Sequence, residues 1–221
     1  MIEIINRQGP VNLPYTIYFP GVTEETFEAV IDEETRAELL DGLMVVHCAA
    51  TLQHDDIAGF LRGLMALYAE ERDLGTVLGP RSLVRLGPSR LVRTDAYFVR
   101  TGRRLDRHWM YYEGVPDLVV HVVTSASRDV DLGIKRRIHR SAGTGEIWFV
   151  ELDEKRLTVD CKHGEQYREQ VVTDGMVTST VIDGFWIESG WLWKRACRRE
   201  LTCLRKILGK RWPWPARRVR R

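Results

Sequence analysis

The stretch from Arg93 to Lys135 constrains the fold of this chain more than any other. At its centre, Leu118 to Val123 reads Leu-Val-Val-His-Val-Val, a nearly continuous apolar run that is typical of a central strand covered on both faces. Asp131 to Ala142 then reads as a helix stopped at Gly143, and Glu146 to Leu152 follows as another buried strand. A strand, a helix and a second strand in this order predict a right-handed crossover in a mixed sheet.

The flanking sequence predicts further helices and strands. Apolar residues recur at three- and four-residue spacing from about residue 53 to 72, which indicates an amphipathic helix. Asp41-Gly42 between two apolar runs indicates a tight hairpin, and Thr23 precedes a short capped helix. Strands are expected at Ser82–Leu86, Leu91–Val99, Leu157–Cys161, Gln166–Val172 and Val177–Val181, the last three as an antiparallel meander.

Length and charge divide the chain into three parts. Its 221 residues fit one compact domain at 23–193, with an irregular lead-in at 1–22 and a C-terminal tail at 194–221. The tail has 12 Lys and Arg against one acid, although the net charge of the whole chain is only +2. The pattern suggests a basic amphipathic helix there that binds nucleic acid, an anionic membrane surface or a partner. We rank a phosphate-binding or disordered tail above a membrane role.

No segment is long and apolar enough to predict a membrane span. The first residues lack the apolar run and the cleavage site of a signal peptide. We therefore expect a cytoplasmic protein.

Polar residues on two predicted strands and one helix suggest a site. Strand alternation places Arg93, Asp95 and Tyr97 on one face, and Asp95 can lie beside either Asp117 or His121 if the strands are adjacent. A carboxylate is a suitable ligand for Mg²⁺ or Mn²⁺, and a nearby lysine such as Lys135 stabilises negative charge on a phosphate. The spacing is compatible with metal-assisted phosphodiester hydrolysis.

At this point the chain resembles the Uma-type putative restriction endonucleases of the PD-(D/E)XK nuclease superfamily. The similar segments run through most of residues 23 to 193 and keep the order found in that family. They are Ala37-Glu38-Leu39-Leu40-Asp41-Gly42, His54, Leu91 to Val99 around Arg93-Thr94-Asp95, Gly114 to Ser125 around Pro116-Asp117-Leu118, Asp131 to Arg137, and Gly145 to Val150.

The resemblance implies an α/β (α+β) fold, a restriction-endonuclease-like mixed β-sheet flanked by helices, here followed by the basic helical tail. It also implies hydrolysis of DNA with Mg²⁺ or Mn²⁺, in which Asp95 is a metal ligand and Lys135 is the catalytic lysine relocated to the helix. Glu38 matches a further acid near the metal. Nuclease folds of this kind often pair subunits to cut both strands, so a homodimer is expected. We assign nucleic-acid contacts to Arg93, Arg136, Arg198 and Arg199.

Three residues depart from the family pattern. Thr94 replaces a proline, Leu43 replaces a common glutamate, and His121 replaces the glutamate expected as the second metal ligand. Imidazole suits transition metals better than Mg²⁺. His121, which we assign together with Asp95 and Lys135 to the catalytic set, therefore either shifts the metal preference or marks a degenerate site. The protein is therefore either an endonuclease, which we favour, or an inactive nuclease-fold module that binds nucleic acid or a partner. A further alternative for His121 is a core histidine with its hydrogen bonds satisfied inside the fold.

Overall fold

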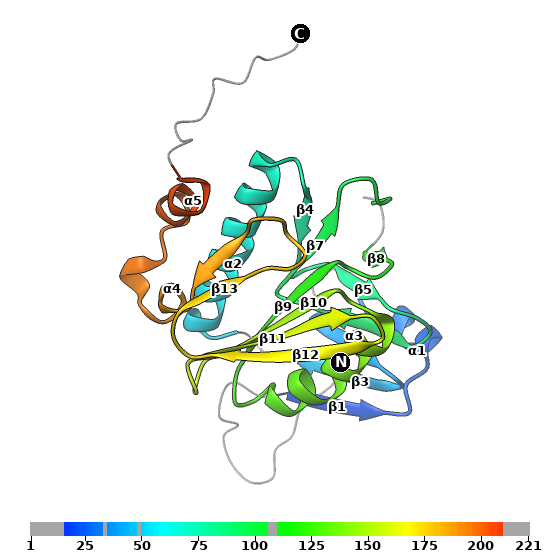
Figure 1. Ribbon diagram of the computed structural model, residues 1–221. Helices are drawn as coiled ribbons and strands as arrows, with labels where there is room; N and C mark the ends of the chain where they lie inside the picture. Colours follow the sequence, from blue (N-terminus) through cyan, green and yellow to red (C-terminus); the bar gives the residue numbers. More distant parts are fainter. Residues whose placement is uncertain (1–15, 33–34, 48–49, 106–109, 210–221) are drawn as a thin grey trace.

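The computed structural model describes residues 16–32, 35–47, 50–105 and 110–209. Two six-stranded sheets and a two-stranded ribbon are packed with helices (Figure 1). The helices are α1 (Glu24–Val30), α2 (Leu52–Glu71), α3 (Arg136–Ala142), α4 (Gly190–Trp193) and α5 (Glu200–Leu208), together with a π-helix, η1 (Val130–Lys135), and a 3-10 turn, η2 (Arg195–Cys197). The predicted combination of mixed sheet and flanking helices is confirmed.

The first sheet contains the central strands that the sequence predicts. Its order is β12-β11-β10-β9-β7-β4. β9 and β10 are parallel and are connected through η1 and α3, whereas the other neighbours are antiparallel. The strands are β4 (Gly75–Leu78), β7 (Ala96–Arg100), β9 (Leu118–Val123), β10 (Glu146–Glu151), β11 (Arg156–His163) and β12 (Gln166–Val172).

The second sheet begins within the expected lead-in. Its order is β1-β3-β2-β6-β5-β8, and its strands are β1 (Thr16–Pro20), β2 (Ala37–Leu40), β3 (Leu43–His47), β5 (Leu83–Arg85), β6 (Arg90–Arg93) and β8 (Tyr111–Glu113). β1 pairs with β3, so the irregular lead-in predicted for residues 1–22 is wrong for residues 16–20; residues 1–15 lie outside the described part. Asp41 and Gly42 both have positive φ, as the two-residue hairpin between β2 and β3 requires.

The strand expected over Leu91–Val99 is divided between the two sheets. β6 pairs with β2 and β5, whereas β7 pairs with β4 and β9. Thr94 and Asp95 lie at the crossing point, where the chain leaves one sheet and enters the other. The prediction of a single strand was wrong here because local sequence does not reveal which strands each half of the segment pairs with.

The predicted meander also ends earlier than expected. β13 (Met176–Thr178) pairs with β14 (Trp186–Glu188) instead of with β12. The residues after β13 are held by the buried Glu146, whose Oε2 accepts hydrogen bonds from the backbone N–H groups of Thr180 (3.0 Å) and Val181 (3.2 Å). Thr180 and Val181 lie in a bend, although the sequence predicted a strand over Val177–Val181.

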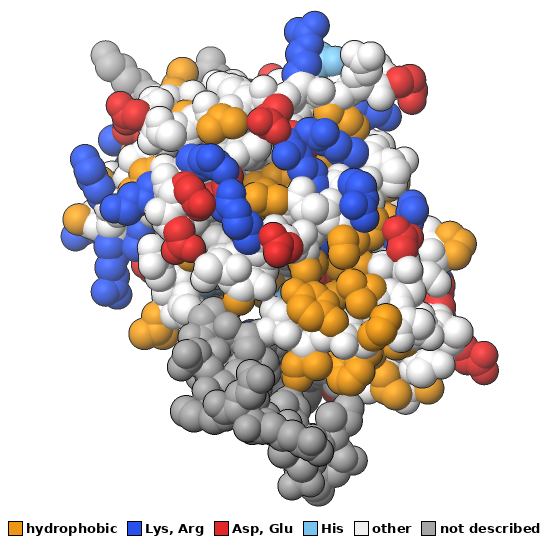
Figure 2. Space-filling model, turned by 90° about the horizontal axis from the view of Figure 1, so that it is seen from below, with side chains coloured by type: hydrophobic (Ala, Val, Ile, Leu, Met, Phe, Trp, Pro, Cys, Tyr) orange, Lys and Arg blue, Asp and Glu red, His pale blue; other side chains and the backbone are white. Residues whose placement is uncertain are grey.

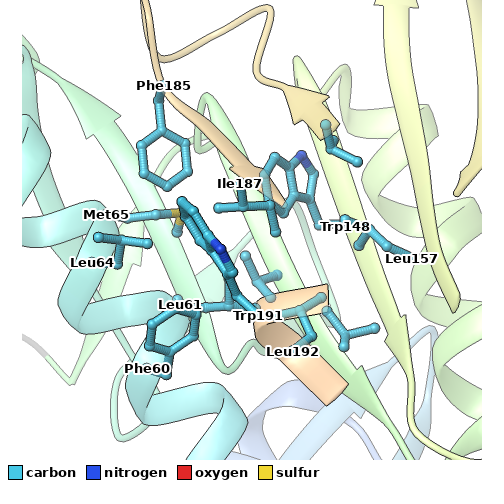
Figure 3. Close-up of a cluster of buried hydrophobic side chains, with 14 of the residues drawn as sticks. Phe60, Leu61, Leu64, Met65, Trp148, Leu157, Phe185, Ile187, Trp191 and Leu192 are labelled. Carbon is cyan, nitrogen blue, oxygen red and sulfur yellow. The ribbon is translucent and has the colours of Figure 1, made fainter. Parts of the chain in front are cut away.

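The two faces of the first sheet are covered by different parts of the chain. On one face, Ala96, Phe98, Val120 and Trp148 belong to the same buried cluster as the apolar side of α2. Figure 3 shows this side of α2 facing Trp148, Phe185 and Trp191. On the opposite face, the strand residues pack against Val84 and Tyr112 of the second sheet and against Leu132 of η1. Both sheets and α2 therefore surround the crossing point at Asp95.

The C-terminal region packs against α2. Cys203 and Leu204 of α5 are buried in the main cluster, and Arg198 donates to Asp56 of α2 (2.6 Å). The one amphipathic helix predicted after Trp191 is instead divided into α4, η2 and α5. Trp212 to Pro215 lie outside the described residues. Within the described ranges, no helix has the length and apolar content needed to cross a membrane.

Candidate active site

A pocket of about 430 Å³ opens at the crossing point between the two sheets. Its walls come from segments that are far apart in the sequence: β3, the start of α2, the β6–β7 junction, β9 and η1. The polar residues that line it include Arg36, His47, His54, Arg81, Arg93, Asp95, His121, Asp131 and Lys135. The structure thus brings Asp95, His121 and Lys135 to one pocket, as the sequence predicted.

Asp95 is anchored on the strand that carries His121. Its backbone N–H donates to the Val120 carbonyl (3.0 Å), and its Oδ2 accepts from the Val122 N–H (2.7 Å). Asp117 lies elsewhere, because its carboxylate accepts from the Arg100 N–H (2.9 Å) and from Arg103 (3.0 Å). Strand alternation allowed either Asp117 or His121 beside Asp95, and the structure places Asp95 beside His121.

The Asp95 carboxyl is partly enclosed, with an 18% exposed side chain. Burial raises its pKa, and the nearby His54 acts in the opposite sense. Oδ1 is the oxygen that Val122 does not use, and it lies 3.4 Å from His54 Nε2. Asp95 therefore keeps one oxygen for a ligand in the pocket.

Glu38 is fully buried, and both of its oxygens have partners. Oε1 lies 2.9 Å from Lys135 Nζ and 2.6 Å from His47 Nε2, while Oε2 accepts from the Arg93 N–H (2.9 Å). Burial alone would raise the pKa of Glu38, but Lys135 and His47 hold it well below its usual range. Glu38 is a charged partner of Lys135, and this arrangement leaves it poorly placed to bind a metal.

Lys135 lies between two buried carboxylates. Its Nζ is 3.0 Å from Asp131 Oδ1, one helical turn earlier, and it donates to the Arg93 carbonyl (3.4 Å). Burial opposes its charge, but Asp131 and Glu38 raise the pKa of Lys135 above its usual range. Lys135 is therefore a fixed positive charge at the pocket wall. Sequence reasoning did not assign a role to Asp131, although its spacing of four residues from Lys135 was a usable signal.

His121 is buried and its ring is held on two sides. Nε2 lies 3.1 Å from Nε2 of His139, and the ring stacks on Phe149 at 5.5 Å between centroids. The other nitrogen, Nδ1, is 4.0 Å from Asp131 Oδ1. Burial lowers the pKa of His121, and the positive charge of the nearby Lys135 lowers it further. In this contact one ring donates and the other accepts. Because the pKa values of both histidines are lowered, His121 is a neutral residue, and its Nε2 is already engaged.

The histidine pair predicts a loss of stability in mild acid. Burial, and then the neighbouring His121, lower the pKa of His139 as well, so an unfolded chain takes up two protons near pH 6.5 that the folded chain excludes. Stability should fall as pH drops below about 6.5, by at most about 2.7 kcal/mol per pH unit. Asp95 has the opposite effect on stability. Because its pKa is raised in the folded chain, the folded chain binds its proton more readily than the unfolded chain, which favours folding as the pH falls.

Urea unfolding between pH 7 and pH 5 measures this dependence. The double variant His121→Phe, His139→Phe should show a smaller slope, since it has lost both excluded protons. An equal slope in the two proteins would show that the histidine pair does not cause the effect.

The expected ligands Asp95, His121 and Glu38 fit a metal only in part. Among the described residues, no group of three or more His, Cys, Asp or Glu side chains is arranged to hold an ion. Glu38 and the Nε2 of His121 are engaged in the contacts above, whereas no described hydrogen bond occupies Asp95 Oδ1, and Asp95 lines the pocket. Divalent cations are often held by one or two carboxylates with water and substrate phosphate. Asp95 fits a cation held in this way, with water and a substrate phosphate as its other ligands.

Most of the arginines assigned to nucleic acid are engaged within the fold. Arg93 lines the pocket, but its guanidinium donates to backbone carbonyls, including those of Ala37 (2.8 Å) and Thr35 (2.7 Å). Arg136 binds Asp160 and Glu169, Arg198 binds Asp56, and Arg199 is exposed at the start of α5. Figure 2 shows one face on which basic and acidic side chains are interspersed beside a hydrophobic patch.

The sheets, the flanking helices and this pocket define a nuclease-like α+β fold. The crystal structure of a putative nuclease belonging to DUF820 from Anabaena variabilis ATCC 29413 matches it with a TM-score of 0.68 at 13% identity, over 78% of this chain and 97% of that chain. The model of the Uma2 family, described as putative restriction endonuclease, matches residues 24–190, and the chain belongs to that family. None of the curated proteins matches the chain.

Proposed function

We propose that this protein is a divalent-metal-dependent endonuclease that hydrolyses phosphodiester bonds in DNA. The observation that carries this proposal is the position of Asp95 in the wall of the pocket that the charged Lys135 also lines, with no described hydrogen bond to Asp95 Oδ1. Membership of the putative restriction endonuclease family supports it. For cleavage of both strands, we propose that two chains act as a homodimer.

Asp95 is the residue that would hold the cation. The Val122 N–H fixes Oδ2, so the orientation of Oδ1 is set before any ligand arrives. A bound dication lowers the pKa of water and neutralises charge that develops on a phosphate. Preorganised groups of this kind contribute more than mobile ones because no reorganisation is needed during the reaction.

Lys135 would stabilise the negative charge of the scissile phosphate. Glu38, Asp131 and the Arg93 carbonyl hold its ammonium in one position. The pocket is also lined by Arg36, Arg81 and Arg93, so it carries charges of both signs and suits a cation and a phosphate together. The phosphate and the cation are therefore expected to enter as a pair.

Cleavage of supercoiled plasmid tests the proposal. The full chain is incubated with plasmid and either Mg²⁺, Mn²⁺ or EDTA, and nicked and linear products are separated on a gel. We expect nicking with a divalent ion and none with EDTA. Absence of cleavage with every ion tested would contradict the proposal.

The buried His121–His139 pair favours a second candidate function. His121 stands where the family pattern has a metal-binding glutamate, and its Nε2 is bonded to His139 instead of facing an ion. A protein with this site and no catalysis would be a module that binds nucleic acid or a partner. DNA binding that persists without any cleavage would support this second candidate.

A further inference from the structure

His54 differs from the other histidines near the pocket. His47 is bonded to Glu38, and His121 and His139 are bonded to each other. His54 Nδ1 is buried without a hydrogen-bond partner among the described residues, and His54 Nε2 lies 3.4 Å from Asp95 Oδ1. This last separation is longer than an ordinary N–H···O hydrogen bond. Among the described residues, His54 Nε2 therefore has only the ion pair with Asp95 Oδ1, and His54 Nδ1 has no hydrogen-bond partner.

The separation of 3.4 Å suits two ligands of one ion. Donor atoms that each lie about 2.1 Å from a metal, at angles between 90° and the tetrahedral value, are about 3.0–3.4 Å apart. Both side chains are 18% exposed, so an ion can reach them from the pocket.

The protein scaffold holds both donors in place. The backbone N–H of His54 donates to Thr51 Oγ1 (3.2 Å) at the start of α2. The apolar side of α2 is buried against the first sheet. Asp95 is anchored on β9 through Val122. Because the two donors are carried by different, packed parts of the fold, little ordering is needed when an ion binds.

We propose that His54 and Asp95 together hold the cation, and that the site prefers a transition-metal dication such as Mn²⁺ to Mg²⁺. This inference rests on the proposed function. It moves the nitrogen ligand from His121, whose Nε2 is occupied, to His54. Neutral imidazole binds transition metals better than it binds Mg²⁺, which accounts for the selectivity.

Electron paramagnetic resonance of Mn²⁺ tests this ligand pair without relying on activity. Free aqueous Mn²⁺ gives a six-line spectrum that weakens as the ion binds, so the spectrum yields an affinity for the full chain. His54→Ala should weaken Mn²⁺ binding by about 10- to 100-fold or more. His163→Ala is the matched control, because His163 is exposed at the end of β11 and should leave the affinity unchanged.

Competition by Mg²⁺ measures the selectivity in the same experiment. Mg²⁺ should displace Mn²⁺ more readily from His54→Ala than from wild type, because the nitrogen ligand is lost. His54→Leu, which offers no ligand atom, serves as a second variant if His54→Ala does not fold, as judged by thermal unfolding. Unchanged Mn²⁺ affinity in either folded variant overturns the inference.

The two proposals fail in different ways. Binding of Mn²⁺ that depends on His54, without plasmid cleavage, supports the ligand pair and contradicts the nuclease function. Cleavage by a His54→Ala protein with normal Mn²⁺ affinity overturns the ligand pair and leaves the nuclease function in place.

Discussion

Asp95→Asn should reduce the rate of DNA cleavage by about 100- to 1000-fold. The substitution removes the negative charge that would bind the cation, while the amide oxygen of asparagine can still accept the Val122 N–H. Burial raises the pKa of Asp95, which means that the fold disfavours the charged carboxylate. We therefore expect the stability of the variant to equal or exceed that of wild type, as is common when a charged functional group is neutralised.

Asp117→Asn is the matched control for this measurement. Asp117 precedes β9 and pairs with Arg100 and Arg103, away from the pocket residues. Rates of plasmid cleavage and urea unfolding are measured on both variants. Equal rates for Asp95→Asn and wild type would show that Asp95 does not bind the catalytic ion.

Lys135→Met should lower the free energy of unfolding by about 3–5 kcal/mol. The ammonium is the shared partner of Glu38 and Asp131, which are both buried. Methionine has a similar length but no charge, so two carboxylates would remain in the interior without their cation. Removal of one partner from a buried ion pair is costly for this reason, whatever the net contribution of the intact pair.

Urea unfolding of Lys135→Met and of Lys162→Met measures this effect. Lys162 is exposed on β11, so its substitution should change the stability very little. Adding Glu38→Gln to Lys135→Met should restore part of the loss, because one unpaired charge disappears. A loss below about 1 kcal/mol for Lys135→Met would contradict the buried ion-pair network.

Local patterns in the sequence predicted many of the elements. The Asp41-Gly42 dipeptide specified a hairpin because few residues adopt two successive positive φ angles, and Gly143 ended α3 in the left-handed region. The apolar run of β9 identified a central strand because both of its faces are buried. These features depend on residues close together in the chain.

The remaining features depend on contacts between distant residues. The division of the 91–99 segment at Thr94 and Asp95 follows from the pairing of β6 and β7 with different sheets. Pairing of His121 with His139 engages Nε2 of both rings, and it is not visible from the spacing of the two residues. The position of His54 beside Asp95 likewise follows from the packing of α2 against the first sheet.

Calorimetric titration with Mn²⁺ and Mg²⁺ tests the central claim most directly. Wild type and Asp95→Asn are titrated as full chains under identical conditions, and the heat is fitted for the number of ions bound. The account predicts saturable binding of a divalent ion to wild type and its loss in Asp95→Asn. Equal binding to both proteins, or no binding of either ion to wild type, would contradict the assignment of this pocket as a metal-dependent active site.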